Sequence, residues 1–151
     1  MIQHPNMRPV TLADAIYVAR NMRGDDVREC WAASHVCPTW AVLGGIKRSS
    51  ASWTLVSPRG LSMAILGVSR VGQGMSAIWL LGTPEIEHVG YRFTRDSVKM
   101  ADQIGVHYGT LINAVHARNV THIRWLKLLG FKFAPGVHAG PDNELFIPFM
   151  R

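Results

Sequence analysis

The sequence predicts a mixed α/β domain, with a central mixed sheet flanked by helices, and three stretches of the chain indicate it. Residues 53–82 alternate apolar runs of strand length with glycine-containing turns, which is typical of an antiparallel meander. Residues 94–107 follow with an apolar period of helical spacing, and residues 111–133 then read as strand, helix and strand. Crossover connections between strands are right-handed. A crossover through this helix should therefore place the strand at 111–115 parallel to the strand at 76–82.

Length and composition indicate one folded domain over residues 1–151. The hydrophobic content of 48% is ample for a core and excludes a disordered chain. The formal net charge of +6 favours an acidic protein, nucleic acid or another anionic surface as a partner, without identifying which. No apolar run approaches membrane-spanning length, and the first residues lack the apolar centre of a signal peptide, so we expect a soluble, unsecreted protein with no membrane partner.

The first third of the chain should form an edge strand and three helices. Residues 7–10 are expected at a sheet edge, where Pro9 is tolerated. Thr11 and Asp14 have the spacing of a capping box at the start of the first helix. Helices over about 27–33 and 39–46 follow, and acidic residues precede the first of them, at its positive end.

The meander should consist of strands at 53–57, 61–69 and 76–82. Both faces of the middle strand are apolar, because Met63 and Ile65 alternate with similarly apolar neighbours. We therefore expect this strand to be central, with both of its faces covered. The glycine-flanked Gln73 falls in the following hairpin turn and is interpreted as structural.

The helix that the sequence indicates most clearly follows the strand at 111–115. Asn119 or Thr121 is expected to cap its first turn through a side-chain hydrogen bond. The residues of its core-facing side recur at helical spacing and are Ile123, Leu126 and Leu129. Gly130 should end the helix in a left-handed conformation, and residues 131–133 resume a strand that pairs with a final strand at 144–149.

The segment from Asn119 to Phe131 resembles, without a gap, the last conserved segment of the GCN5-related N-acetyltransferases (GNATs). Asn119 and Ile123 match its Asn and Ile positions, and Leu129 to Phe131 match its Leu-Gly-Phe. Two positions depart: His122 replaces the usual Ala, and Leu126 replaces the Tyr that commonly serves as general acid towards the leaving thiolate of coenzyme A. Leu126 has no proton to give. The resemblance implies the GNAT fold.

The same resemblance implies a phosphate-binding loop before the helix at 94–107, and the sequence lacks it. In GNATs, glycine-rich backbone there holds the pyrophosphate of acetyl-CoA at the helix N-terminus. Here Gly90 stands alone among bulky side chains, and Glu85 and Glu87 add negative charge. We therefore expect no bound cofactor and a vestigial cleft near Asn119 and Leu126, unless the chain is an active enzyme that uses acetyl-CoA.

A narrower resemblance combines the missing loop with the pattern Asn-x-x-His-Ile-Arg-aromatic-Leu-Lys-x-x-Gly at Asn119 to Gly130. It looks like the GNAT-like phage proteins grouped with internal virion protein A of short-tailed phages. That resemblance implies a role in virion assembly, in the virion or in the host cytoplasm. The implied partners are other phage structural proteins or a second copy of the chain.

Few residues remain as candidates for chemistry. Glu85, Glu87 and His88 follow the third meander strand and could act as a general base, although a solvated turn is the favoured interpretation. Four further histidines lie on different predicted elements and suggest no metal cluster: His107, His116, His122 and His138. Cys30 and Cys37 lack zinc or redox spacing even with His35 between them, so we expect two reduced, buried thiols and no metal.

Two hypotheses follow. The first is a non-catalytic protein that works by contact through Arg118, Arg124, Lys127 and Trp31, since Arg and Trp often anchor interfaces. We expect these basic side chains to face solvent, and Trp31, Trp40 or Trp53 to be partly exposed. The alternative is an N-acetyltransferase that acts on an unidentified amine. A nucleic-acid partner is compatible with the charge but has no supporting motif.

Overall fold

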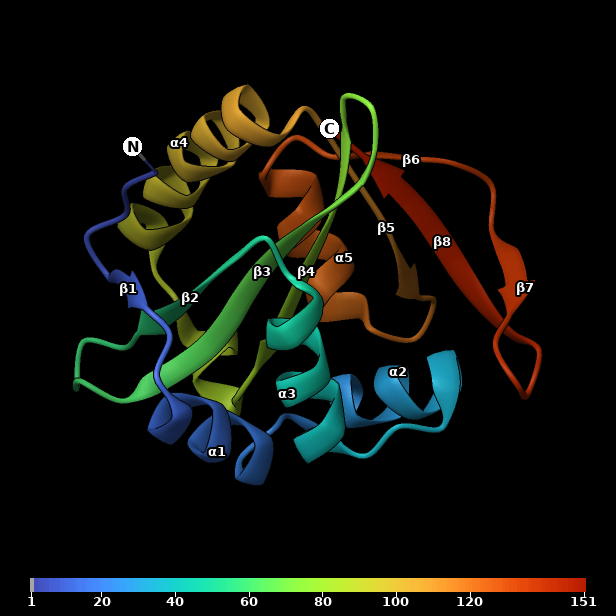
Figure 1. Cartoon of the computed structure of the whole chain (residues 1–151), viewed down its shortest axis with the longest axis horizontal. Coiled ribbons are helices and arrows are strands. Elements are labelled where there is room, and N and C mark those ends of the chain that lie inside the picture. Colours follow the sequence, from blue (N-terminus) through green and yellow to red (C-terminus); the bar gives the residue numbers. More distant parts are fainter. Residues whose placement is uncertain (1) are drawn as a thin grey trace.

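The computed structural model describes residues 2–151, which fold around one sheet with helices on both faces (Figure 1). This confirms the predicted mixed α/β fold. The elements, in chain order, are β1 (Met7–Pro9), α1 (Leu12–Arg20), α2 (Gly24–Ser34), α3 (Pro38–Arg48), β2 (Ala51–Val56), β3 (Ser62–Gly72), β4 (Met75–Gly82), the 3₁₀ helix η1 (Pro84–His88), α4 (Tyr91–Tyr108), β5 (Thr110–His116), α5 (Val120–Leu128), β6 (Lys132–Phe133), β7 (Val137–Ala139) and β8 (Glu144–Met150).

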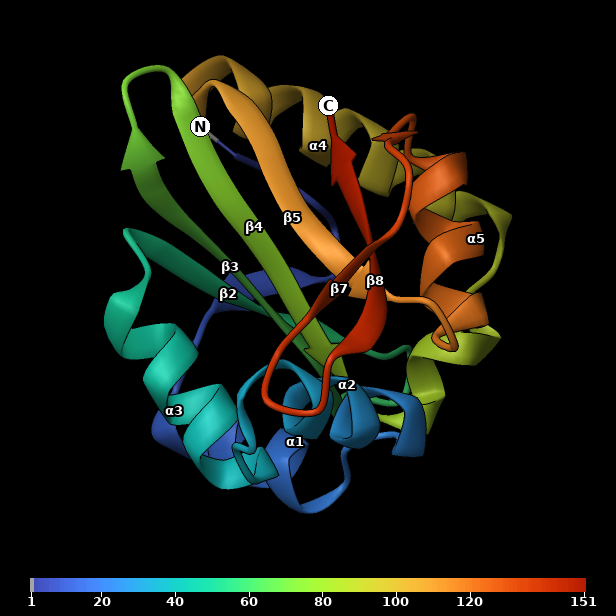
Figure 2. The ribbon, with the colours of Figure 1, turned by 90° about the vertical axis from the view of Figure 1, so that its right-hand side faces the viewer.

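The strands described form one sheet in the order β1-β2-β3-β4-β5-β8-β6, and β7 also pairs with β8. All of the pairs are antiparallel except β4 with β5, where residues 75–77 lie beside residues 110–112. The parallel pair predicted from the crossover is therefore confirmed, and so is the pairing of β6 with the final strand. Figure 2 shows β5 between β4 and β8.

The helices cover the sheet in two layers. Helices α1 and α3 pack on one face, where Val18 and Val42 meet Ile65 of β3 and Leu81 of β4 in one core cluster. Helices α4 and α5 pack on the other face, and the larger core cluster there includes Ile104. These two layers are the reason that β3 is apolar on both sides, as its sequence predicted.

Gly67 in β3 has a specific packing role. A Cβ atom at this position would lie 2.3 Å from the indole of Trp79 on the neighbouring strand, so only glycine leaves room for that ring. The indole Nε1 donates to the Ser49 hydroxyl over 2.8 Å. The close approach fixes Trp79 against the α3 side of the sheet.

The predicted capping box of α1 is present: Asp14 N–H donates to the Thr11 hydroxyl, and Asp14 Oδ2 accepts from Thr11 N–H. Arg8, Thr54 and Ser62 also donate to the Asp14 carboxylate. Burial opposes ionisation, but these bonds outweigh it and hold the pKa of Asp14 well below its usual value. The box thus joins α1 to three strands.

The structure corrects three details of the sequence analysis. Helix α4 begins at Tyr91, three residues before Thr94, because extended Gly90 already serves as its N-cap. Cys30 is half-buried as a free thiol, whereas Cys37 is exposed, so the expectation of two buried thiols is wrong for Cys37. The strand β7 was not predicted. Within residues 2–151, no helix combines the length and the apolar character that crossing a membrane requires.

Candidate functional site

The parallel strands β4 and β5 pair over a few residues and then separate. Their backbone pairing ends at Ala77 and Ile112. Just beyond, Asn113 Nδ2 donates to the carbonyl oxygen of Ile78 over 2.7 Å, and Asn113 Oδ1 accepts from the Ala114 N–H over 2.8 Å. An amide side chain thus takes the place of the next backbone bond between the strands, and a gap opens towards their C-terminal ends.

One backbone donor of β4 faces this gap. The N–H of Thr83 donates to Met63 of β3, and backbone groups alternate sides along a strand. The N–H of Gly82 accordingly points away from β3, and the N–H of Leu80, two residues earlier, shares that side. Because the β4–β5 pairing described above ends before Leu80, its N–H is available to a group bound in the gap.

Helix α2 closes the wide end of the gap with two carboxylates. Asp26 Oδ2 accepts from the Gly82 N–H at the end of β4 over 2.9 Å. Glu29 Oε1 accepts from the His116 N–H at the end of β5 over 2.7 Å. Asp26 and Glu29 are three residues apart on a helix, so their side chains lie on one face of it. One helix can therefore bind the ends of both diverging strands.

A buried polar network holds α2 to the start of α5. Arg23 Nη1 donates to Asp26 Oδ1 over 2.7 Å, and both terminal nitrogens of Arg23 donate to Asn119 Oδ1 over 3.1 Å. Asn119 Nδ2 in turn donates to Asp26 Oδ1 over 3.0 Å. Arg23 and Asp26 are 4% and 0% exposed, so removal of either partner would leave a buried charge unpaired.

This network corrects the predicted role of Asn119. It occupies the N-cap position of α5, but its side chain makes no capping hydrogen bond. The buried amide instead joins Arg23 and Asp26, and its Nδ2 reaches Glu29 Oε1 over 3.3 Å. The interaction with a buried ion pair outweighs a local cap, since unpaired buried charges cost more than a bare helix end.

The carboxyl group of Glu29 has a pKa near neutral pH. Burial raises this pKa most and the nearby Asp26 charge also raises it, while hydrogen bonds from His116 and Asn119 and the charge of Arg23 lower it, and together they bring it to about 7. A general base works best when its pKa lies near the working pH. Glu29 is therefore the group of this site best suited to accept a proton from a bound amine.

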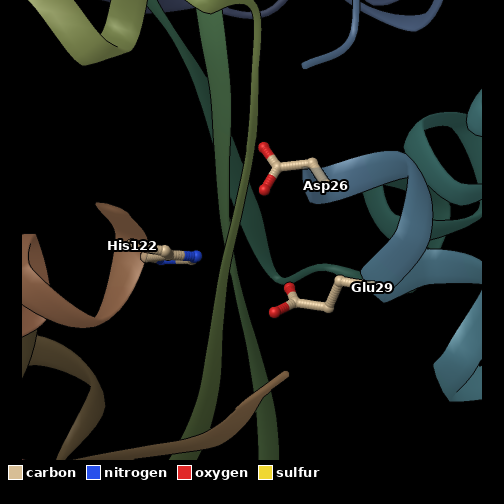
Figure 3. Close-up of side chains that lie close together, drawn as sticks. All are labelled: Asp26, Glu29 and His122. Atoms are coloured by element: carbon tan, nitrogen blue, oxygen red, sulfur yellow. The ribbon is translucent and has the colours of Figure 1, made fainter. Parts of the chain in front are cut away.

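His122, in the first turn of α5, points at these carboxylates from the opposite side (Figure 3). Possible ligand atoms of Asp26, Glu29 and His122 all lie within 4.8 Å of one another. Asp26 is already paired with buried Arg23 and accepts the Gly82 N–H, however, so a metal ion would compete with an ion pair for this ligand. The cluster is better suited to proton transfer than to metal binding.

A cavity of about 590 Å³ passes through the gap in the sheet. Its walls include Glu29 and Trp79 on the α2 and α3 side, and His122, Trp125 and Leu126 on the α4 and α5 side. Trp125 Nε1 and His122 Nδ1 are buried without a hydrogen-bond partner within residues 2–151. Since buried polar atoms are rarely left unpaired, these two indicate a polar group that binds in the cavity.

The residues singled out by sequence lie in different places. Leu126 is buried on the cavity wall, whereas the exposed Arg118, Arg124 and Lys127 face solvent, as expected for their side chains. Trp31 is 52% exposed.

The three candidates after the third meander strand lie on η1, outside the cavity wall. Glu87 accepts from Arg23 Nε over 3.1 Å, Glu85 lies 3.7 Å from Arg59, and His88 is exposed. Paired with arginines, the two carboxylates repel an incoming phosphate less than the sequence suggested. None of the three is a better base than Glu29.

Sequence reasoning missed Arg23, Asp26 and Glu29. Asp26 was interpreted only as a charge at a helix start, where it does lie, and the other two carried no motif. These residues are distinguished by their burial against the ends of β4 and β5, which are far from α2 in the sequence. A basic residue followed by two acids at helical spacing is too common a pattern to reveal it.

The topology, the parallel pair that separates and the helices on both faces are those of the GNAT acetyltransferase fold. No protein-family model and no curated protein sequence matches the chain. Solved structures match over nearly all of it. A GNAT-family acetyltransferase from Bacillus anthracis has a TM-score of 0.69 and 10% identity, covering 99% of this chain and 95% of its own.

Two further matches were solved with ligands. YncA from Salmonella typhimurium, described as a putative acetyltransferase with acetyl-CoA, has a TM-score of 0.67, 12% identity and coverage of 98% and 92%. Spermidine N-acetyltransferase from Vibrio cholerae, with CoA and spermine, has a TM-score of 0.66, 11% identity and coverage of 95% and 92%. At these identities the similarity establishes the fold alone.

Proposed function

We propose that this chain is an N-acyltransferase, which moves an acyl group from an acyl-CoA thioester to an amine in the gap between β4 and β5. One observation supports this function above others: a single cavity crosses the gap and holds the Glu29 carboxyl, beside a β4 edge that offers the Leu80 N–H. This is the enzyme alternative of the sequence analysis, and the fold of the acetyltransferases above agrees with it.

The chemistry needs one hydrogen-bond donor and one base. The amine nitrogen attacks the thioester carbon, a C–N bond forms, the C–S bond breaks, and the nitrogen loses a proton. Negative charge develops on the thioester oxygen, to which the Leu80 N–H can donate. Glu29 accepts the proton, while the His116 N–H and Asn119 hold its other oxygen in position.

The thioester donor fits the cavity walls in two respects. The unpaired Trp125 Nε1 suits an amide group of a pantetheine arm. The first turn of α4 has no side-chain cap, and exposed Arg92 adds positive charge there for a pyrophosphate. The glycine-rich loop is still missing, so weaker than micromolar binding of acetyl-CoA stays a prediction.

The proposal is tested by incubating the purified protein with millimolar acetyl-CoA and a panel of amines. Thiol release and the mass of the acetylated amine are measured together, so that plain thioester hydrolysis is subtracted. Replacement of the base in Glu29→Gln should lower kcat by about 100-fold or more. The matched variant Glu85→Gln, which removes a carboxylate outside the cavity, should retain full activity.

Two results would contradict the proposal. One is a wild-type protein that acetylates no amine of the panel under these conditions. The other is equal activity of Glu29→Gln and wild type, which would remove Glu29 from the reaction and leave the cavity without an assigned base.

A contact role in a phage particle remains a second proposal. Its support is the exposure of Trp31 and of Trp40, at 52% and 68%, on helices α2 and α3, since large exposed aromatics often anchor interfaces. The basic side chains around α5, Arg118, Arg124 and Lys127, would supply the polar part of such a surface. The two proposals use different parts of the molecule, so one chain can be tested for both.

A further inference from the structure

His122 is unusual in having no hydrogen bond at either ring nitrogen within residues 2–151. Its Nδ1 is sealed from solvent, and the residue lies on the wall of the cavity that crosses the sheet. A buried imidazole without a partner costs free energy, since the nitrogen has given up its bonds to water. A fold keeps such a group where a bound molecule supplies the missing partner.

The separation between His122 and Glu29 suits one bridging atom. A ring nitrogen of His122 and a carboxylate oxygen of Glu29 lie within 4.8 Å of each other, and Figure 3 shows the two side chains facing across the gap. Two hydrogen bonds of about 2.8 Å that meet at a tetrahedral or trigonal atom span roughly that distance. An amine nitrogen or a water molecule can therefore contact both side chains.

Resting on the proposed acyl transfer, we propose that His122 is a second catalytic residue, which receives the amine proton from Glu29 and donates a proton to the leaving sulfur. Asp26, the other acid of the cluster, is less suited to this role because its charge is already paired with buried Arg23 and its Oδ2 accepts the Gly82 N–H. Leu126, one turn further along the same cavity wall, has no proton to give.

The proton balance closes without a further reactant. The amine loses one proton to Glu29, a water molecule that bridges the two side chains carries it on to one ring nitrogen of His122, and the other ring nitrogen gives its proton to the thiolate. A neutral imidazole can do this because it carries one N–H and one lone pair. Burial lowers the pKa of His122, and although Asp26 raises it and Arg23 lowers it again, the balance keeps the ring neutral at pH 7.

The test compares three variants in the acetylation assay. His122→Ala should lower kcat by about 100-fold with little change in KM for the amine. Added imidazole should restore much of the lost kcat of His122→Ala, since the vacated space can admit it. His122→Gln keeps a donor and an acceptor but cannot relay a proton, so it should be equally slow and should not respond to imidazole. His107→Ala, on the exposed last turn of α4, is the control and should match wild type.

Each outcome bears on the inference separately from the proposed function. Loss of kcat with imidazole rescue supports the relay. An active wild-type protein whose His122→Gln variant keeps full kcat, or whose folded His122→Ala variant is slow but not rescued, overturns the relay and leaves acyl transfer by Glu29 standing. A wild-type protein without activity refutes the proposed function itself. Thermal melting of each variant identifies losses that come from misfolding.

Discussion

Replacing Glu29 by Gln should stabilise the protein, and the gain should grow with pH. Gln has the shape of the protonated carboxyl group and can still accept the His116 N–H bond. At alkaline pH the wild-type protein must keep a charged carboxylate in a buried cavity, whereas the variant does not. Such a result would show that the wild-type chain retains a buried carboxyl group at a cost in stability.

The magnitude follows from the pKa of Glu29, which burial raises from 4.5 to about 7. A raised pKa in the folded state means that folding favours the protonated form. The associated stability is therefore fully present below pH 4.5 and is lost as the pH rises through 7. At 1.36 kcal/mol for each pKa unit, the loss approaches about 3 kcal/mol by pH 8, as an upper bound because Glu29 keeps some exposure.

The assay is urea unfolding of both proteins at pH 5, 6, 7 and 8, followed by tryptophan fluorescence. We expect the gain of Glu29→Gln to rise from below about 1 kcal/mol at pH 5 to about 2–3 kcal/mol at pH 8. Glu85→Gln removes a surface carboxylate and should stay within about 0.5 kcal/mol of wild type throughout. A gain that does not depend on pH, or a less stable variant at pH 8, would refute the assignment of a buried, proton-holding Glu29.

Three further predictions concern packing, charge and surface. Arg23→Met should lower the free energy of unfolding by about 3–5 kcal/mol in urea, because it leaves a buried carboxylate unpaired. Gly67→Ala should cost about 1–3 kcal/mol and shift tryptophan fluorescence, whereas Gly105→Ala in open space on α4 should be neutral or stabilising. Arg124→Glu with Lys127→Glu should leave the melting temperature unchanged; if the contact proposal is right, it should weaken particle assembly, and normal assembly would contradict that proposal.

The fold could be predicted well because its signals are local. Apolar alternation in β3, the capping box at Thr11 and the period of α4 depend on neighbours in sequence, and each produced the expected element. The crossover rule then gave the parallel pair without any long-range information. The strand β7 was missed because its three residues are all exposed and carry no apolar pattern.

The site could be predicted only in part because its signals are not local. Leu126, which the family pattern placed near a cleft, lies on the cavity wall, yet that pattern says nothing about Glu29. Ninety residues separate Glu29 from Asn119, and the pKa of Glu29 depends on the strand end and the helix start between which it is buried. Such a shift arises from assembly, so it becomes visible only once the strands have been arranged.

The pairing of β4 with β5 ends at one amide group. Asn113 imitates a peptide unit: it satisfies the Ile78 carbonyl with its Nδ2 and the Ala114 N–H with its Oδ1, and so ends the ladder without leaving either group unpaired. Without such a side chain, two parallel strands would continue to form backbone hydrogen bonds and would leave no gap between them. The Asn113 side chain therefore ends the pairing of β4 with β5 while it satisfies the last backbone partners. The gap between the two strands opens directly beyond it.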